Sequence, residues 1–514
     1  MFHRVLVANR GEIAVRVMRA CREMGIEAVA VYSEADTAAP HVLQADRAVC
    51  IGAPPSSESY LNIARLIDAA RSSGADAVHP GYGFLAENAA FAQAVEDAGF
   101  TFIGPSADAI AAMGDKTLAR RTVAAAGVPV VPAEDDPLGR GLSHRPEAGA
   151  TSSDDRAALA VAATRLGYPL LIKAAAGGGG KGMRVVRQES ELEASFQAAA
   201  REAQGAFGDD RLFLERYVER PRHVEVQILA DHHGTIVHLG ERECSIQRRH
   251  QKLVEETPSP AVDATLRRQM TDAAVAAARS VGYRNAGTVE FLLAPDGAFY
   301  FLEMNTRLQV EHPITELVTG IDLVHAQLRI AAGERLWLRQ EDIVARGHAI
   351  ECRICAEDPA QQFLPRPGRI VSLHEPHGPG IRVDSGITPG YEVPLYYDPL
   401  LAKLSVWDET RDAARRRMIA ALQDYVILGC TTGIPFLIDV LEHPAFAGGE
   451  THTHFIADHF PTWSGREHHR TIAAIAAAID ATRRQPSASA EQPDGAASAS
   501  PGSTLGHWRL GQRR

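Results

Sequence analysis

The chain has 514 residues, of which 45% are hydrophobic and 23% are charged, values that are ordinary for a globular protein and exclude a mainly disordered or fibrous one. Its formal net charge of −11 argues against general nucleic-acid binding, which usually needs a basic face. No apolar stretch approaches the roughly 18 residues that span a bilayer, so no membrane contact is expected, and six scattered cysteines favour a reducing, cytoplasmic setting.

The N-terminal part of the chain predicts an open α/β domain. Strands at 4–9 and 28–32 flank a helix at 12–24, and this spacing is typical of a parallel sheet. The first turn, Asn9-Arg10-Gly11-Glu12, lacks the GxGxxG pattern of a dinucleotide site, which disfavours a dehydrogenase. Further helices are expected at about 60–73 and 88–98, and further strand positions at Val78 and 102–103.

The middle of the chain predicts a hairpin with a glycine-rich tip. A loop at 139–155, rich in Gly, Ser, Pro and Asp, precedes an alanine-rich helix at 156–167. Strands at 169–173 and 183–186 then enclose a run of glycines. Residues 211–303 continue with alternating strands and helices, including strands at 224–228 and 287–293.

The C-terminal part changes character twice. Residues 346–407 are rich in strand formers, Gly and Pro, and helices are expected at about 410–424 and 433–442. Residues 485–504 hold Pro, Ser, Ala and Gly with little apolar bulk, which indicates a disordered linker after an alanine-rich helix at 471–484.

Two patterns in this part resemble metal sites but favour simpler interpretations. Cys352 and Cys355 form a CxxC without a second pair at a suitable spacing, so we expect small apolar residues of a strand. A group of histidines near the end of the fold is expected to be solvated, namely His452, His454, His459, His468 and His469.

The strongest chemical signal is a glycine run between two lysines. Gly177 to Gly180 stand between Lys173 and Lys181, and glycine N–H groups can approach phosphate oxygens closely and form an anion cradle. The run is not a Walker A loop, because Lys181 is followed by Gly182 and a strand instead of by Ser or Thr opening a helix. The pattern predicts a site for nucleotide phosphates, and the simpler alternative is a flexible hairpin tip.

Acids on two expected strands predict a metal site beside this loop. Alternation places Glu303 and Asn305 on one face of a strand, and Glu290 lies on the strand before it. Hard oxygen ligands from neighbouring strands suit Mg²⁺ bound to nucleotide phosphates. Residues 241–252 and 305–312 interleave Gln, Arg and Glu with apolar residues, which favours a polar cleft for a small anion over an exposed charged surface.

In their order and spacing these motifs are similar to those of the biotin carboxylases, which belong to the ATP-grasp superfamily. The stretches that carry the resemblance are Ala8–Ala14, His79–Asn88, Met113–Lys116, Lys173–Met183, Pro221–Glu225, Gln247–Lys252, Glu303–His312 and Glu351–Ile354. The resemblance implies an α/β fold with an N-terminal biotin carboxylase (Rossmann-like, pre-ATP-grasp) domain at 1–114, an ATP-grasp domain at 115–335 with a mobile lid at about 132–216, a C-terminal biotin carboxylase domain at 336–460 and a partly disordered tail at 461–514.

The resemblance also implies a reaction. ATP and bicarbonate form carboxyphosphate, which collapses to CO₂ and phosphate, and N1′ of biotin is then carboxylated. This is the first half-reaction of an acetyl-, propionyl- or other acyl-CoA carboxylase. It requires ATP and two Mg²⁺ or Mn²⁺ ions, with biotin as a substrate on a separate carrier. Glu311 is the expected general base for bicarbonate, and Arg353 the expected stabiliser of the biotin enolate.

The remaining roles implied by the resemblance divide by ligand. Bicarbonate is bound by Lys252, Arg307, Gln309 and the Val310 amide, of which Lys252 and Arg307 also count as catalytic. The metal ligands are Glu290, Glu303 and Asn305, and Tyr82 joins Arg353 at biotin. The ATP-binding set is Lys116, Lys173, Gly178, Gly179, Gly180, Lys181, Glu215, Arg216, Val218, His223 and His250.

The resemblance implies partners as well. No Met-Lys-Met biotinylation motif occurs in the chain, so we expect it to act on a separate biotin carboxyl carrier protein, beside a carboxyltransferase subunit. A homodimer is also implied, with Arg19 and Glu23 near its interface.

Two alternatives stay open. An ATP-grasp ligase similar to carbamoyl-phosphate synthetase would use ammonia in place of biotin, and the Tyr82 segment and Arg353 argue against it. A catalytically silent regulatory or scaffold subunit is opposed by the intact set of Lys116, Lys252, Glu290, Glu303, Glu311 and Arg353.

Overall fold

The computed structural model describes residues 1–134, 153–174, 182–249 and 251–465, with only the backbone for 153–156. Met1–Ser464 is one of two units of the chain, and the other, Gly465–Arg514, lies almost wholly outside the described residues. The predicted tail elements at 471–484 and 485–504 and most of the loop at 139–155 also lie outside them. Among the helices of the described ranges, none has the length and apolar character that a membrane span requires.

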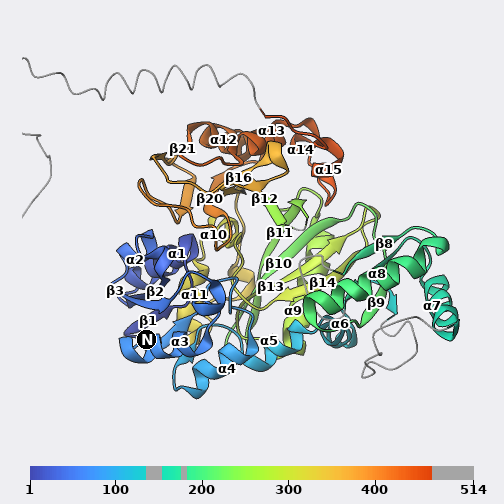
Figure 1. Cartoon of the computed structure of the whole chain (residues 1–514), viewed down its shortest axis with the longest axis horizontal. Coiled ribbons are helices and arrows are strands. Elements are labelled where there is room, and N and C mark those ends of the chain that lie inside the picture. Colours follow the sequence, from blue (N-terminus) through green and yellow to red (C-terminus); the bar gives the residue numbers. More distant parts are fainter. Residues whose placement is uncertain (135–152, 175–181, 250, 466–514) are drawn as a thin grey trace, which may run out of the picture. The chain divides into compact units, whose positions relative to one another are not determined.

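A five-stranded parallel sheet organises the N-terminal part (Figure 1). Its order is β3-β2-β1-β4-β5, with β1 (Arg4–Val7) between β2 (Glu27–Ser33) and β4 (Ala77–His79). The predicted strands and helices of this region are confirmed. The other elements are α1 (Gly11–Glu23), α2 (Pro40–Gln44), β3 (Arg47–Gly52), α3 (Ile63–Ser73), α4 (Ala89–Asp97), β5 (Thr101–Phe102) and α5 (Ala107–Gly114).

Local chemistry explains where these helices begin and end. The Asn62 side chain accepts a hydrogen bond from the Arg65 N–H at the start of α3, and Gly74, in the left-handed conformation, ends the helix. The Asn88 side chain caps α4 in the same way.

A small four-stranded sheet carries the predicted hairpin. Its order is β6-β9-β7-β8, and β7 (Leu170–Ala174) pairs antiparallel with β8 (Arg184–Val186), as predicted. The glycine tip at 175–181 lies outside the described residues. Helix α8 (Glu189–Phe207) packs on β7 and β8. The other elements here are α6 (Lys116–Ala125), β6 (Ala133–Glu134), α7 (Ser153–Leu166) and β9 (Leu212–Arg216).

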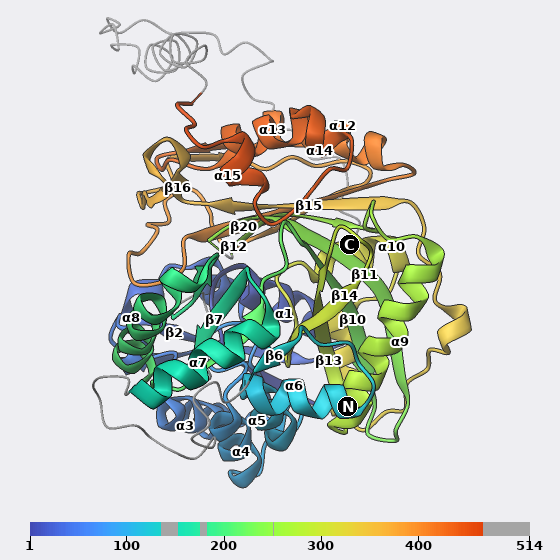
Figure 2. The same ribbon diagram turned by 90° about the vertical axis from the view of Figure 1, so that its right-hand side faces the viewer.

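An eight-stranded sheet forms the centre of the unit, in the order β14-β13-β10-β11-β12-β15-β20-β19 (Figure 2). It contains β10 (Arg222–Ala230), β11 (Ile236–Arg248), β12 (Gln251–Thr257), β13 (Asn285–Leu293), β14 (Phe299–Asn305), β15 (His348–Cys355), β19 (Ile381–Ser385) and β20 (Leu400–Asp408). Because β12 pairs with β15, this sheet continues across the predicted domain boundary at residues 335 and 336.

Helices pack on the faces of this sheet. Figure 2 shows α12 (Arg411–Asp424) and α13 (Ile434–Glu442) above β15 and β20, as the apolar residues on that face require. The remaining elements are α9 (Ala264–Ser280), α10 (His312–Thr319), α11 (Leu323–Ala331), β16 (Glu357–Asp358), β17 (Leu364–Pro365), β18 (Ser372–His374), β21 (Val426–Leu428), α14 (Pro444–Ala447) and α15 (Phe455–His459).

The two metal-like patterns have different outcomes. Cys352 and Cys355 both lie in β15 as free thiols, as predicted. The prediction that the histidines are solvated is wrong for His452, which is buried. The distance between His452 Nε2 and Arg220 Nη2 is 2.8 Å. Packing of the 449–459 segment against the start of β10 encloses His452, as a hydrogen bond from the Thr453 N–H to the Pro221 carbonyl indicates. His468 and His469 lie outside the described residues.

Candidate active site

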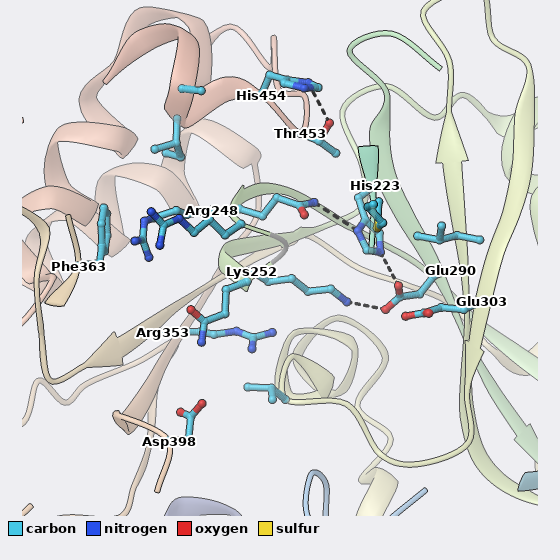
Figure 3. A pocket seen from close by; sticks show the side chains of 18 of the residues that line it. His223, Arg248, Lys252, Glu290, Glu303, Arg353, Phe363, Asp398, Thr453 and His454 are labelled. Atoms are coloured by element: carbon cyan, nitrogen blue, oxygen red, sulfur yellow. Dashed lines mark hydrogen bonds and ion pairs between the residues drawn. The ribbon is translucent and has the colours of Figure 1, made fainter. Parts of the chain in front are cut away.

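A cleft of about 1710 Å³ lies between the small sheet, the central sheet and the loops of the N-terminal sheet (Figure 3). Fifteen of the predicted site residues line it: Tyr82, Lys116, Lys173, Glu215, Arg216, Val218, His223, Lys252, Glu290, Glu303, Asn305, Arg307, Gln309, Val310 and Arg353. Gly178, Gly179, Gly180, Lys181 and His250 lie outside the described residues. Glu311 is fully buried next to the cleft.

Lys252 is the centre of a cluster of carboxylates at the wall of the cleft. Its Nζ lies 2.5 Å from Glu225 Oε2, 2.8 Å from Glu290 Oε1 and 2.6 Å from Glu311 Oε1. Figure 3 shows Lys252 and His223 reaching Glu290 from two sides, and His223 Nε2 lies 2.9 Å from Glu290 Oε2. Burial lowers the pKa of Lys252, but the three carboxylates outweigh it and raise that pKa well above its ordinary value.

Glu311 stands between two cations at the floor of this cluster. In addition to the hydrogen bond from Lys252, Glu311 accepts one from Arg353 Nη2 at 2.9 Å. Burial alone would raise the pKa of Glu311, but the charges of Lys252 and Arg353 outweigh burial and lower it below its ordinary range. Glu311 is therefore ionised at neutral pH and able to take up a proton.

Arg353 is held on the opposite side of Glu311. Its Nε donates to Glu255 Oε1 at 2.6 Å, so its guanidinium is fixed by two carboxylates, Glu255 and Glu311. Strand β15 points Arg353 toward the cleft, next to Lys252 in Figure 3. A fixed guanidinium of this kind stabilises negative charge that develops on a ligand.

Arg307 donates hydrogen bonds to three polar side chains that lie at or near the cleft. Its Nε donates to Glu87 Oε2 at 2.8 Å, its Nη1 to Gln309 Oε1 at 2.9 Å and its Nη2 to Asn305 Oδ1 at 3.0 Å. The Gln309 amide donates in turn to Glu290 at 3.2 Å. Arg307, Gln309 and Lys252 therefore lie together, as a small-anion site requires.

The predicted metal ligands come from two adjacent strands. Glu290 of β13 lies directly opposite Glu303 of β14, and Asn305 ends β14. Burial raises the pKa of Glu303, and the negative charge of Glu290 raises it further. Lys116, whose Nζ lies 3.8 Å from Glu303 Oε2, lowers this pKa but does not offset the rise. The buried Nδ2 of Asn305 has no hydrogen-bond partner among the described residues. Two repelling carboxylates beside an amide oxygen fit a divalent cation such as Mg²⁺.

The far end of the cleft lies between the small sheet and the C-terminal segment. Lys173 of β7 forms an ion pair with Glu215 of β9, and both strands line the cleft. The Tyr217 hydroxyl lies 3.1 Å from His454 Nε2, which brings the C-terminal segment to this end of the cleft. Figure 3 shows Thr453 and His454 at the upper edge of the pocket, above His223. Tyr82, predicted to contact biotin, lines the cleft and donates its hydroxyl to Glu12.

Sequence reasoning missed three acids that hold these cations. Glu225, Glu255 and Glu87 bind Lys252, Arg353 and Arg307, respectively. Glu87 and Glu225 lie inside the motifs that carry the family resemblance, and Glu255 follows Lys252 on the same strand. Their position inside or next to these motifs is the signal that the sequence offered, since enclosed cations need anions to balance them.

Three family models match successive parts of the chain. Residues 1–110 match the family model of the biotin carboxylase N-terminal domain, residues 115–339 that of the carbamoyl-phosphate synthase L chain ATP binding domain, and residues 351–458 that of the biotin carboxylase C-terminal domain. Biotin carboxylase 1 of Bacillus subtilis (strain 168) is 52% identical over 457 residues, 89% of this chain and 98% of that protein.

Two further similarities carry different carboxylase names. A pyruvate carboxylase subunit of Methanothermobacter thermautotrophicus is 52% identical over 459 residues, 89% of this chain and 90% of that protein. The biotin carboxylase domain dimer of 2-oxoglutarate carboxylase from Hydrogenobacter thermophilus was solved in complex with MgADP, ADP and bicarbonate. It gives a TM-score of 0.83 at 48% identity over 89% of this chain and 98% of that chain.

Proposed function

The chain belongs to the biotin carboxylase family and catalyses the ATP-dependent carboxylation of biotin with bicarbonate, and from this premise we propose which of its residues perform each step. The observation that carries the proposal is the position of Glu311 between Lys252 and Arg353, 2.6 Å and 2.9 Å away. Only the middle of the chain matches the carbamoyl-phosphate synthase model, while both flanks match biotin carboxylase models, so biotin and not ammonia is the acceptor.

Glu311 acts as the general base. The bicarbonate O–H proton passes to a Glu311 oxygen, the freed oxygen attacks the γ-phosphorus of ATP, and the bond to ADP breaks, giving carboxyphosphate. Bicarbonate that binds Lys252 and Arg307 draws Lys252 away from Glu311, which removes part of the stabilisation of the carboxylate and raises its basicity at that moment.

ATP lies along the cleft from its base end to the anion end. Glu215, Arg216 and Val218 hold the base, while Lys116, Lys173 and His223 contact the phosphates or ribose. Glu290, Glu303 and Asn305 would hold two Mg²⁺ or Mn²⁺ ions, and these ions would neutralise negative charge on the phosphate oxygens.

Arg353 acts in the second step. Carboxyphosphate breaks into CO₂ and phosphate, the phosphate takes the N1′ proton of biotin, and N1′ attacks CO₂. Negative charge develops on the ureido oxygen of biotin during this step, and Arg353 stabilises it while Tyr82 contacts biotin.

The partners follow from the family. Relatives named for biotin carboxylase, pyruvate carboxylase and 2-oxoglutarate carboxylase share this fold, so the acceptor of the carboxyl group belongs to a separate carboxyltransferase. A biotinylated carrier domain supplies the biotin, with an acyl-CoA carboxylase as one such assembly, in a cytoplasmic setting. A homodimer is supported by the dimer of the Hydrogenobacter thermophilus domain.

One assay tests the activity directly. The purified protein is given ATP, Mg²⁺ and bicarbonate, and ADP release is measured with and without free biotin. We expect biotin to stimulate turnover and the omission of bicarbonate to abolish that stimulation. Absence of any stimulation, both by free biotin and by a biotinylated carrier domain, would contradict the proposal.

A further inference from the structure

Two buried glutamates lie directly opposite each other on neighbouring strands of the central sheet. In the antiparallel pairing of β12 with β15, Glu255 is the partner of Glu351, and neither residue has exposed surface. The Cβ atoms of such a pair stand about 5 Å apart on one face of the sheet. Glu255 Oε2 and Glu351 Oε1 each lack a hydrogen-bond partner among the described residues.

The other carboxylate oxygen of each glutamate accepts a hydrogen bond from a residue outside the pair. Glu351 Oε2 accepts a hydrogen bond from the Ser405 hydroxyl of β20 at 2.6 Å. Glu255 Oε1 accepts one from Nε of Arg353, also at 2.6 Å, and Arg353 reaches Glu311 with its Nη2. Neither glutamate lines the cleft, so the pair supports Arg353 from the side away from the ligands.

The charge of this pair decides what it does. Two ionised carboxylates opposite each other in the interior repel each other, and each has one oxygen without a hydrogen-bond partner among the described residues. One proton between the two free oxygens removes both costs, because one carboxyl then donates to the other. We propose that Glu255 and Glu351 share one proton and, as a single negative charge, position Arg353 for the biotin step; the positioning role rests on the proposed function of Arg353.

The electrostatic surroundings agree with a shared proton. Burial, opposed by Lys403 and reinforced by Glu255, raises the pKa of Glu351 well above its ordinary value. Burial also raises the pKa of Glu255 to about 7, although the Arg353 charge lowers it. The charged and titratable side chains that interact electrostatically with one or both glutamates are Lys252, Glu311, Arg353, Lys403, Cys244, Cys352 and Cys355. Burial raises the pKa of the three thiols, which keeps them protonated.

Thermal unfolding across pH tests the shared proton independently of catalysis. The unfolded carboxyls release their protons above about pH 4.3, while the folded pair keeps one, so the stability it contributes is lost as pH rises through the folded pKa. The E351Q variant imitates the protonated partner and does not titrate. We expect its unfolding midpoint to rise relative to the wild-type midpoint between about pH 5 and pH 8. A difference that stays constant over this range overturns the shared proton.

Biotin kinetics test the positioning role, with the two glutamates as matched variants. E255Q removes the charge under Arg353, and we expect kcat for biotin carboxylation to fall at least about tenfold while the KM for ATP stays within about twofold. E351Q leaves that charge on Glu255, so its loss in kcat should be several times smaller. Equal losses in the two variants, or a wild-type rate in E255Q, overturn the positioning role. If wild type itself does not carboxylate biotin, the proposed function fails, and the unfolding test of the pair still stands.

Discussion

Lys252 and Glu311 form an ion pair with 2.6 Å between Nζ and Oε1, although Glu311 has no exposed surface. Burying a carboxylate without a partner is costly, and this pair, completed by Arg353, keeps Glu311 charged in the interior. In the proposed mechanism Lys252 therefore has two functions, holding Glu311 before bicarbonate arrives and holding bicarbonate afterwards.

Replacing Glu311 by Gln tests the base. The amide keeps the size of the side chain but cannot take up a proton, so we expect bicarbonate-dependent ATP turnover to fall by at least about 100-fold. Nucleotide binding should stay within about threefold of wild type, since Glu311 lies outside the nucleotide end of the cleft. ADP release and nucleotide fluorescence titration measure the two effects. Turnover at the wild-type rate would remove Glu311 from this role.

Replacing Arg353 by Lys separates charge from geometry. Lysine keeps one positive charge but replaces the planar fork, whose Nε donates to Glu255 and whose Nη2 donates to Glu311, by a single ammonium, so it does not reproduce the position of both donors. We expect kcat for biotin carboxylation to drop by about 10- to 100-fold, with the KM for bicarbonate little changed. Steady-state kinetics with biotin and bicarbonate varied in turn make the comparison. A larger effect on bicarbonate than on biotin would assign Arg353 to the first step.

Replacing Glu303 by Gln tests the metal site. The amide removes one of the two carboxylates that face each other across β13 and β14, so the attraction for a divalent cation falls. We expect the Mg²⁺ concentration for half-maximal turnover to rise at least about tenfold, and added EDTA to abolish activity in wild type. Glu202, a paired acid of α8 that does not line the cleft, provides the control variant Glu202→Gln. An equal Mg²⁺ requirement in wild type and Glu303→Gln would exclude Glu303 as a ligand.

The sequence predicted the parts of this fold that depend on local patterns. The two strands on either side of the glycine run, β7 and β8, and the helices α3 and α4 were predicted from patterns of a few residues, and the structure agrees with these predictions. Contacts between distant residues were harder to foresee. Glu87 and Arg307 are 220 positions apart, and only the folded chain brings them within 2.8 Å.

For the candidate site as well, some residues could be predicted from local motifs and others could not. Residue types in motifs indicated the cations and the metal ligands, because their chemistry is carried by the side chain itself. The acids that support them were not predicted, since Glu225 and Glu255 occupy strand positions where alternation alone gives no reason to prefer a charge. The enclosure of His452 was also missed, because it depends on how the 449–459 segment packs against the start of β10.

Two buried histidines predict how stability depends on pH. Burial lowers the pKa of His41 and of His79 to about 4, below the value of about 6.5 in an unfolded chain. Between these values the unfolded state binds more protons, so stability is present above about pH 6.5 and is lost as pH falls toward 4. We expect His79→Gln to flatten this acid slope by one proton while keeping a hydrogen bond to Gln327. Urea unfolding midpoints across this range measure the slope, and an unchanged slope would contradict the buried neutral state.

A fully buried arginine, Arg242, binds Glu225, one of the carboxylates that surround Lys252. Arg242 Nε lies 2.5 Å from Glu225 Oε1, and its Nη atoms donate to Gln227, Thr288 and Thr315. Arg242→Met leaves Glu225 as a buried carboxylate with Lys252 as its remaining cation, so we expect a loss of about 3–5 kcal/mol in unfolding free energy.

The double variant Arg242→Met, Glu225→Gln provides the matched control, because it removes both charges. We expect it to recover a large part of the lost stability, as measured by urea unfolding at constant protein concentration, since no unpaired charge stays in the interior. Activity should not recover with it, because Glu225 also holds Lys252, and Lys252 then turns more strongly toward Glu290 and Glu311. A single variant as stable as wild type would show that Arg242 is not needed to balance Glu225.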